Sequence, residues 1–376
     1  MKMRFADVIG HASIKNRLVR TVRENRISHA QMFLGPSGAG KLALAIAYAQ
    51  YINCRSKKDN DSCGVCPSCV KYGKLAHPDL HFLYPTAKTD KVDKPVSLDF
   101  VREWRELLAD SRQYITLADW YAKINIERKQ AIINARDCNN LIQTLSYKNY
   151  EADYKVMIIW MVEKLFHAAA PKILKILEEP PDRTLFILVA EDTESILPTI
   201  LSRTQIIKVP PIDQDSLLQH FLGQGVSPQL ANDALRVYPG DLVMAQRMIR
   251  DNGADDRNFE LFRQWMRLCY QGKMEELIRF VGDIVKNTRE FHKSFLTYSL
   301  RMSRETFLVS RGSPTLTRMN SKEAELVDNF NPFINNRNIQ LINEAFNDAI
   351  YHIERNVNSS VMFLDLSLKF VSYLRM

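Results

Sequence analysis

The sequence has no apolar run that approaches the roughly 18 residues of a membrane span. Its first residues, MKMRFADVIGH, also lack the apolar core of a secretory signal peptide. Both absences predict a cytoplasmic protein with no membrane partner. Cysteine is scarce, with six among 376 residues. In a cytoplasmic chain, clustered cysteines are better explained by metal ligation than by disulfides. No internal repeat or low-complexity tract is apparent.

The overall composition is that of a globular protein, with 46% apolar and 25% charged residues. The length allows two or three domains. The net charge is +8. This mild excess is compatible with a nucleic-acid partner, but it does not identify one.

A phosphate-binding loop is the strongest motif. The apolar run 32–34 has the length of a buried strand, residues 35–41 spell GPSGAGK, and helix-forming residues follow. In G-x-x-x-x-G-K, glycines let backbone N–H groups face phosphate oxygens at a helix N-terminus. The candidate nucleotide-binding residues are Gly35, Gly38, Gly40 and Lys41. The alternative is a glycine-rich turn that binds no nucleotide.

Two elements of nucleotide hydrolysis are missing from the sequence. The position after Lys41 needs a Ser or Thr hydroxyl for Mg²⁺, but Leu42 stands there. An ATPase also needs an acidic pair at the end of the strand 155–160, and the chain has Trp160-Met161. Glu163 comes too late in the sequence to replace that pair. We therefore expect ATP binding to be weak or absent, and no hydrolysis.

Four cysteines follow the P-loop helix with the spacing C-x8-C-x2-C-x2-C, and four thiolates complete a tetrahedral zinc site. Such a site has no open position, so the zinc would be structural. The alternative is a set of reduced, unliganded thiols. The predicted ligands are Cys54, Cys63, Cys66 and Cys69.

The order of patterns along the chain predicts its architecture. Apolar strands alternate with helices up to residue 211, which is typical of a parallel sheet covered on both faces. After Ile212 the pattern is almost entirely helical. We therefore predict an α/β P-loop domain over 1–211, a small helical domain over 212–253 with a linker at 251–256, and an all-α domain over 254–376.

Three smaller segments complete the prediction, and two of them admit two interpretations. Apolar positions in 126–147 are consistent with a helix. The aromatic residues of 104–121 form either a satellite core, which we favour, or a docking surface. Arg17, Arg20 and Arg23 occupy a basic helix face that is either solvated or in contact with phosphates.

Taken together, these motifs resemble the bacterial clamp-loader AAA+ family of the DNA polymerase III holoenzyme. The shared features include the VIGH entry, the P-loop, the cysteine insertion, His77-Pro78-Asp79, the LEEPP run at 177–181 and the ILSR run at 200–203. The resemblance implies an AAA+ P-loop domain, a helical lid and a helical collar that holds the oligomer together. Residues 86–125 are a longer insertion than the family has, and the sequence gives them no role.

Within this family, the chain is most similar to the non-hydrolysing delta-prime branch. Leu42 and Trp160-Met161 are two departures from the ATPase pattern. A third lies in the lid, where the family's G-S-x-R-x-A appears as GDLVMA. Val243 stands at the position of the family's arginine. Losses at three elements of one mechanism are expected of a subunit that no longer hydrolyses ATP.

The resemblance also gives Arg203 a role. In the family, the arginine at this position projects into the ATP site of a neighbouring subunit, and such a finger is worth about 10³–10⁵ in rate. The implied partners are the ATPase subunits and the delta subunit in a hetero-pentameric ring, the sliding clamp and primer–template DNA. The alternative is a surface arginine in a salt bridge.

Two other functions remain open from the sequence. One is an active clamp-loader ATPase, of gamma/tau type, with atypical metal ligation. The other is a zinc-dependent nucleic-acid-binding module with no ATPase partner.

Overall fold

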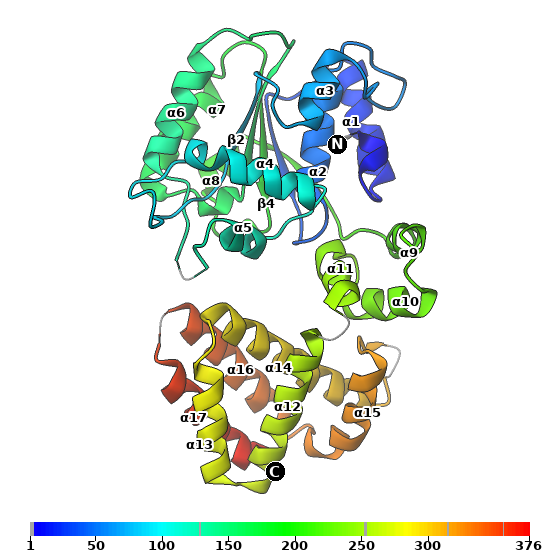
Figure 1. The fold of residues 1–376 in the computed structure, drawn as a ribbon, viewed down its shortest axis with the longest axis vertical. Coiled ribbons are helices and arrows are strands. Elements are labelled where there is room, and N and C mark those ends of the chain that lie inside the picture. The colour runs from blue at the N-terminus through cyan, green and yellow to red at the C-terminus, as the bar shows by residue number, and fades with distance from the viewer. Residues whose placement is uncertain (1–3, 128, 252–253, 314–315, 356) are drawn as a thin grey trace. The chain divides into compact units, whose positions relative to one another are not determined.

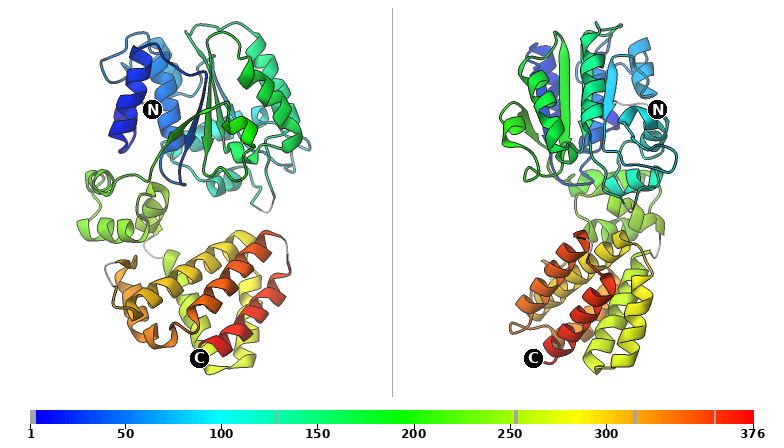
Figure 2. Two further views of the ribbon diagram at one scale, coloured as in Figure 1. Left: turned by 180° about the vertical axis from the view of Figure 1, so that it is seen from behind. Right: turned by 90° about the vertical axis from the view of Figure 1, so that its left-hand side faces the viewer.

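The computed structural model describes residues 4–127, 129–251, 254–313, 316–355 and 357–376. It contains two compact units, which are drawn in Figure 1 and Figure 2. The first comprises Met1–Gly225 with Pro239–Met244, and the second comprises Val226–Tyr238 with Ala245–Met376. The linker predicted at 251–256 is wrong where the structure describes it, because Asp251 ends one helix and Ala254 begins the next, and residues 252–253 lie outside the described residues. Among the described helices, none is long and apolar enough to cross a membrane.

The first unit is built on a five-stranded sheet in which every strand pairs in parallel, in the order β2-β3-β4-β1-β5. Met32 of β1 pairs with Leu188 of β4 on one side and Ile206 of β5 on the other. The predicted parallel sheet is confirmed. Its strands are β1 (Ala30–Leu34), β2 (Leu80–Leu83), β3 (Lys155–Trp160), β4 (Thr184–Ala190) and β5 (Gln205–Lys208).

Helices cover both faces of this sheet, as Figure 1 and Figure 2 show, with α1 and α2 on one face and α6 and α7 on the other. Alternate side chains of β3 and β4, such as Met157 and Phe186, pack with α6 and α7 in one core cluster. All twelve residues of α2 are buried. The main helices are α1 (Ala12–Arg23), α2 (Lys41–Ile52), α3 (Pro67–Gly73), α4 (Val101–Asp110), α5 (Leu117–Lys123), α6 (Ala135–Ser146), α7 (Ala170–Glu178), α8 (Pro198–Leu201) and α9 (Gln214–Gly223).

The helix predicted over 126–147 is too long. Helix α6 begins at Ala135, because the Asn134 side chain caps it by accepting the N–H groups of Arg136 and Asp137 at 2.8 and 3.1 Å. Ile132 and Ile133 precede the helix and form isolated β-bridges instead. Their apolar side chains therefore reflect a short extended segment, not a helix face.

The insertion 86–125 carries its own aromatic core. The side chains of Trp104 and Trp120 are almost fully buried, and their ring centroids lie 5.2 Å apart at right angles. The Trp120 indole N–H donates to the carbonyl of Pro85 at 2.8 Å, and Tyr84 stacks on Trp104. The satellite core predicted from the aromatic residues is therefore confirmed for Trp104 and Trp120, which hold α4 and α5 against the sheet edge at β2, whereas Tyr114 of the same set lies against Gly40 instead.

The second unit is helical over its described residues. Trp265 is fully buried at its centre, with aromatic rings around it, and its indole N–H donates to Ser367 at 2.8 Å. Its helices include α10 (Pro228–Val237), α12 (Ala254–Gln271), α13 (Met274–Val285), α14 (Arg289–Ser310), α15 (Ser321–Phe330), α16 (Ile339–Glu354) and α17 (Ser359–Tyr373). Helix α11 (Leu242–Asp251) belongs in part to each unit.

Candidate functional site

The P-loop lies at the carboxyl end of β1, where the chain turns into α2. Gly38 and Gly40 have φ values of +71° and +76°, which favour glycine. Gly35 has an ordinary backbone, but a Cβ at this position would overlap the carbonyl oxygen of Val209. The sequence therefore forms the strand, turn and helix that a phosphate-binding loop requires.

The P-loop lysine is held inside the protein. The side chain of Lys41 is 6% exposed, and its ammonium donates to the Pro36 carbonyl at 2.5 Å. The carboxylate of Glu191 lies 3.8 Å away. Burial lowers the pKa of Lys41, and the carboxylates of Glu191, Glu163 and Asp241 oppose that shift. The Lys41 ammonium, which would bind a phosphate in a nucleotide-binding loop, is thus hydrogen-bonded to the Pro36 carbonyl of the loop itself.

The structure buries the apolar side chains that stand where the resemblance leads us to expect hydrolytic groups. Leu42, at the start of α2, is 4% exposed. Trp160 and Met161, at the end of β3, are also 4% exposed, and Val243 is 7% exposed. These side chains offer no ligand to Mg²⁺ and no donor to a γ-phosphate. In the described part of the chain, the one group of three or more potential metal ligands is the cysteine cluster.

Sequence reasoning dismissed Glu163 as too late in the chain for the acidic pair and gave Asp241 and Tyr114 no role at the P-loop, but the fold brings all three residues to this region. Asp241 lies against Gly38, where a Cβ would overlap its carboxylate. Glu163 accepts the backbone N–H of Glu191 at 3.0 Å, and burial raises its pKa. The ring of Tyr114 lies against Gly40. These residues are remote in sequence from the loop, so no local pattern could have identified them.

The four predicted cysteine ligands come together. Their sulfur atoms all lie within 4.8 Å of one another, and those of Cys63 and Cys69 are 3.9 Å apart. Sulfurs bound about 2.3 Å from one tetrahedral ion would lie about 3.8 Å apart, so the geometry fits a metal ion. Cys138 and Cys269 are buried elsewhere, as expected of packed residues.

Backbone donors in the cysteine cluster favour a thiolate at Cys63, whereas burial raises the pKa of the Cys54 and Cys69 thiols. The Cys63 sulfur accepts the N–H groups of Cys66 and Val65 at 3.2 and 3.5 Å, and the Cys54 sulfur accepts the N–H of Cys63 at 3.3 Å. Burial would raise the pKa of the Cys63 thiol, but the hydrogen bonds lower it to about 6. A deprotonated sulfur is the form that binds a metal.

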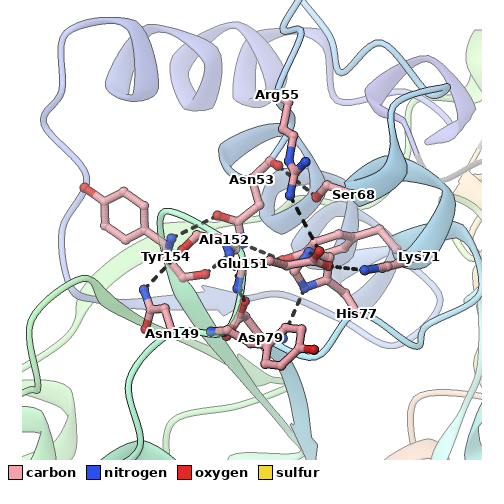
Figure 3. A network of polar contacts seen from close by, with 12 residues as sticks. Asn53, Arg55, Ser68, Lys71, His77, Asp79, Asn149, Glu151, Ala152 and Tyr154 are labelled. Atoms are coloured by element: carbon pink, nitrogen blue, oxygen red, sulfur yellow. Dashed lines mark hydrogen bonds and ion pairs between the residues drawn. The ribbon is translucent and has the colours of Figure 1, made fainter.

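A polar network joins the cysteine-bearing segment to the sheet (Figure 3). The carboxylate of Glu151 is bound by Lys71 of α3 at 2.6 Å and lies 3.4 Å from the His77 ring. The Asn53 amide group donates to the Tyr72 hydroxyl at 2.7 Å and the Tyr154 carbonyl at 2.8 Å. These contacts fix α3 against the loop before β3.

The carboxylate of Asp79 organises the loop before β3 (Figure 3). It is 1% exposed and accepts the backbone N–H groups of Tyr150, Glu151 and Ala152 at 2.7, 2.9 and 2.9 Å. Burial would raise the pKa of Asp79, but these three donors together lower it below its ordinary value. The His77-Pro78-Asp79 motif is therefore structural.

Arg203 lies in the turn between α8 and β5. Its guanidinium forms an ion pair with Glu178, the last residue of α7, and donates to the Thr199 carbonyl at 2.9 Å. The Arg203 side chain is 34% exposed and that of Glu178 is 48% exposed. Two predicted motifs, LEEPP and ILSR, thus meet in one exposed ion pair. In this conformation Arg203 is the salt-bridged surface arginine that the sequence analysis gave as the alternative to a role at a neighbour's ATP site.

The arginines of α1 are all exposed. Arg23 pairs with Asp59 at 3.0 Å. These positions leave both interpretations of the basic face open, and contact with DNA stays a prediction.

The fold and the site together define a P-loop protein with a parallel five-stranded sheet and buried apolar side chains at Leu42, Trp160 and Val243. The family model described as "DNA polymerase III, delta subunit" matches residues 10–213. Because this is more than half of the chain, the protein belongs to that family.

Two curated relatives and one solved structure are similar to this chain. DNA polymerase III subunit gamma/tau of Mycobacterium tuberculosis (strain ATCC 25618 / H37Rv) is 30% identical over 239 residues, which are 62% of this chain and 33% of the relative. The delta' subunit of Haemophilus influenzae is 26% identical over 268 residues, 71% of this chain and 69% of the relative. The chain therefore spans about a third of the gamma/tau protein. A solved gamma subunit-related protein of Thermotoga maritima shares 14% identity at a TM-score of 0.38, over 96% of this chain and 99% of that one.

Proposed function

We propose that this chain is a delta-prime-like subunit of the DNA polymerase III clamp loader that does not hydrolyse ATP and supplies Arg203 to the ATP site of a neighbouring subunit. The observation that carries the proposal is a contrast within one unit. Leu42, Trp160 and Val243 are buried and apolar at the hydrolytic positions, whereas Arg203 remains charged and partly exposed.

The geometry of Arg203 supports action in trans. Its partner Glu178 is half exposed, and ion pairs of this kind contribute about 0–1 kcal/mol. A triphosphate offers more charge and more acceptors to a guanidinium than one carboxylate does. The arginine can therefore leave Glu178 for a neighbour's γ-phosphate at little cost. There it would stabilise the charge that develops during phosphoryl transfer.

The partners follow from the family. We propose that the chain joins ATPase subunits and the delta subunit in a hetero-pentameric ring, with residues 254–376 as the collar, and helps to load the sliding clamp on primer–template DNA in the cytoplasm. In the same proposal, residues 212–253 act as the lid, and the ion held by Cys54, Cys63, Cys66 and Cys69 is a structural Zn²⁺. Zinc fits this site because four thiolates complete its tetrahedral coordination shell.

The test is hydrolysis by the assembled complex. Arg203→Ala should leave assembly intact and reduce clamp- and DNA-stimulated ATP hydrolysis by about 10³-fold at the neighbouring site. Arg203→Lys should rescue poorly, because an ammonium lacks the planar fork of donors. A matched control is Arg102→Ala, which removes an exposed arginine ion-paired with Glu106 at 2.9 Å. Unchanged ATP hydrolysis in an assembled Arg203→Ala complex would refute the proposed role of Arg203 at the neighbouring ATP site.

An active ATPase of gamma/tau type is the second candidate. Its support is the intact G-x-x-x-x-G-K spacing and the carboxylates of Glu163, Glu191 and Asp241 near Lys41. Turnover by the purified chain that is abolished by Lys41→Ala would favour it. A zinc-dependent nucleic-acid-binding module, the third function considered, would instead fail to capture clamp-loader subunits.

A further inference from the structure

The insertion 86–125 sends one side chain into the P-loop region. The turn after α4 places Arg112 and Gln113 at φ +51° and +66°, a left-handed pair that side chains rarely adopt. Residues in this conformation persist only where the surrounding structure holds them. Here the Gln113 backbone N–H donates to the Leu108 carbonyl at 3.0 Å, and Tyr114 follows directly. The turn therefore aims Tyr114 away from the insertion's own core.

Tyr114 lies between the P-loop and the entry segment of the chain. Its hydroxyl accepts the backbone N–H of Ile9 at 2.9 Å, and its side chain is buried, with 8% of the residue exposed. A Cβ built on Gly40 would come within 2.6 Å of the Tyr114 ring, so the ring lies directly against the loop. The His11 ring bonds to the Ala39 carbonyl at 2.8 Å and closes the same region.

These contacts resemble those of a bound nucleotide. A phosphate on a P-loop sits at the N-terminus of the following helix, here at Gly40 and Lys41. The base of the same nucleotide must lie beside the loop, within one ribose of the phosphates. The Tyr114 ring packs on Gly40 and its hydroxyl accepts the Ile9 N–H, so this side chain lies beside the loop, where such a base would lie. The Asp241 carboxylate lies against Gly38, and Pro36 holds Lys41.

We propose that the insertion is a built-in occupant of the nucleotide site, in which the ring of Tyr114 takes the place of the base. The insertion is suited to this task because Trp104 and Trp120 anchor it rigidly in the first unit. A cleft of about 1070 Å³ lies between the entry segment and the turn that precedes Tyr114. It is lined by residues that include Val8, Gly10, Arg112, Gln113 and His220. The proposal goes beyond the loss of catalytic groups, because it predicts that nucleotide is excluded before any chemistry.

The experiment measures binding of a fluorescent ADP analogue with Mg²⁺ to the full chain. The wild type should show no saturable binding at millimolar nucleotide, whereas Tyr114→Ala should gain binding at least tenfold tighter. Adding Lys41→Ala should abolish the gain, which would locate the nucleotide on the P-loop. Tyr150→Ala is the matched control, because Tyr150 is 80% exposed and should behave as the wild type.

Two results would overturn the proposal. One is wild-type binding as tight as that of Tyr114→Ala. The other is a folded Tyr114→Ala chain that gains no binding, which would show that the degenerate loop alone excludes nucleotide. If Tyr114→Ala does not fold, Tyr114→Leu shortens the side chain while keeping an apolar group, and the same comparison applies. Because the readout is binding to one chain, it is independent of hydrolysis in the assembly and of Arg203.

Discussion

The substitution Asp79→Asn tests the loop that the structure places between the cysteine-bearing segment and β3. Asp79 accepts three backbone N–H groups with two oxygen atoms, one on Oδ1 and two on Oδ2. An asparagine keeps one acceptor oxygen and replaces the other with an NH₂ group. In the better orientation its oxygen accepts Glu151 and Ala152, and its amide faces the N–H of Tyr150. One buried donor is then left without an acceptor.

The magnitude follows from these bonds. A hydrogen bond to a charged group contributes about 1.5–3 kcal/mol, and an unsatisfied buried donor costs about 1–3 kcal/mol. The two surviving bonds also weaken when the charge is removed. Asp79→Asn should therefore lower the free energy of unfolding by about 2–4 kcal/mol. Asp153→Asn, an exposed change in the same loop, should cost less than about 0.5 kcal/mol.

Urea unfolding at pH 7 and at lower pH measures this effect. The pKa of Asp79 is lower in the folded state than its ordinary value of 3.8. The stabilisation is therefore complete above that ordinary value and is lost as pH falls through the folded-state pKa. The difference between wild type and Asp79→Asn should shrink below about pH 4. A loss no larger than that of Asp153→Asn at pH 7 would refute this role for the His77-Pro78-Asp79 motif.

Two further predictions concern the metal site and acid stability. Freshly purified, reduced protein should contain one zinc per chain, and metal analysis that finds none would contradict this prediction. Cys69→Ser should lose the zinc and the protection of backbone amides over 54–73 from hydrogen exchange, because structural zinc contributes about 10–16 kcal/mol to the folding of zinc-finger peptides. Burial lowers the pKa of His81 to about 4 in the folded chain. Because the unfolded chain binds the proton more tightly, the free energy of unfolding should fall by up to about 3 kcal/mol as the pH drops from 6.5 toward 4. His81→Gln should lose part of that pH dependence in urea titrations, and an unchanged slope would exclude His81 as its source.

The sequence by itself determined the local features of this protein. Alternating apolar strands and helices predicted the parallel sheet because a strand buried on both faces must be apolar throughout. The spacing of Cys54, Cys63, Cys66 and Cys69 predicted their assembly because two C-x2-C steps place sulfurs within one turn. The glycines of the P-loop predicted its backbone because few other residues adopt positive φ.

Only the tertiary structure decided what surrounds those features. Tyr114 and Asp241 reach the P-loop through the insertion and through the turn before α11, and no local periodicity records such long-range approaches. The ion pair joins Arg203 to Glu178, which is 25 positions earlier in the sequence and on the other side of the strand β4. The start of α6 at Ala135 was set by the Asn134 cap and by β-bridges to Thr86 and Leu165. Helix and strand patterns depend on near neighbours, whereas the contents of the site depend on which remote side chains the folded chain brings together.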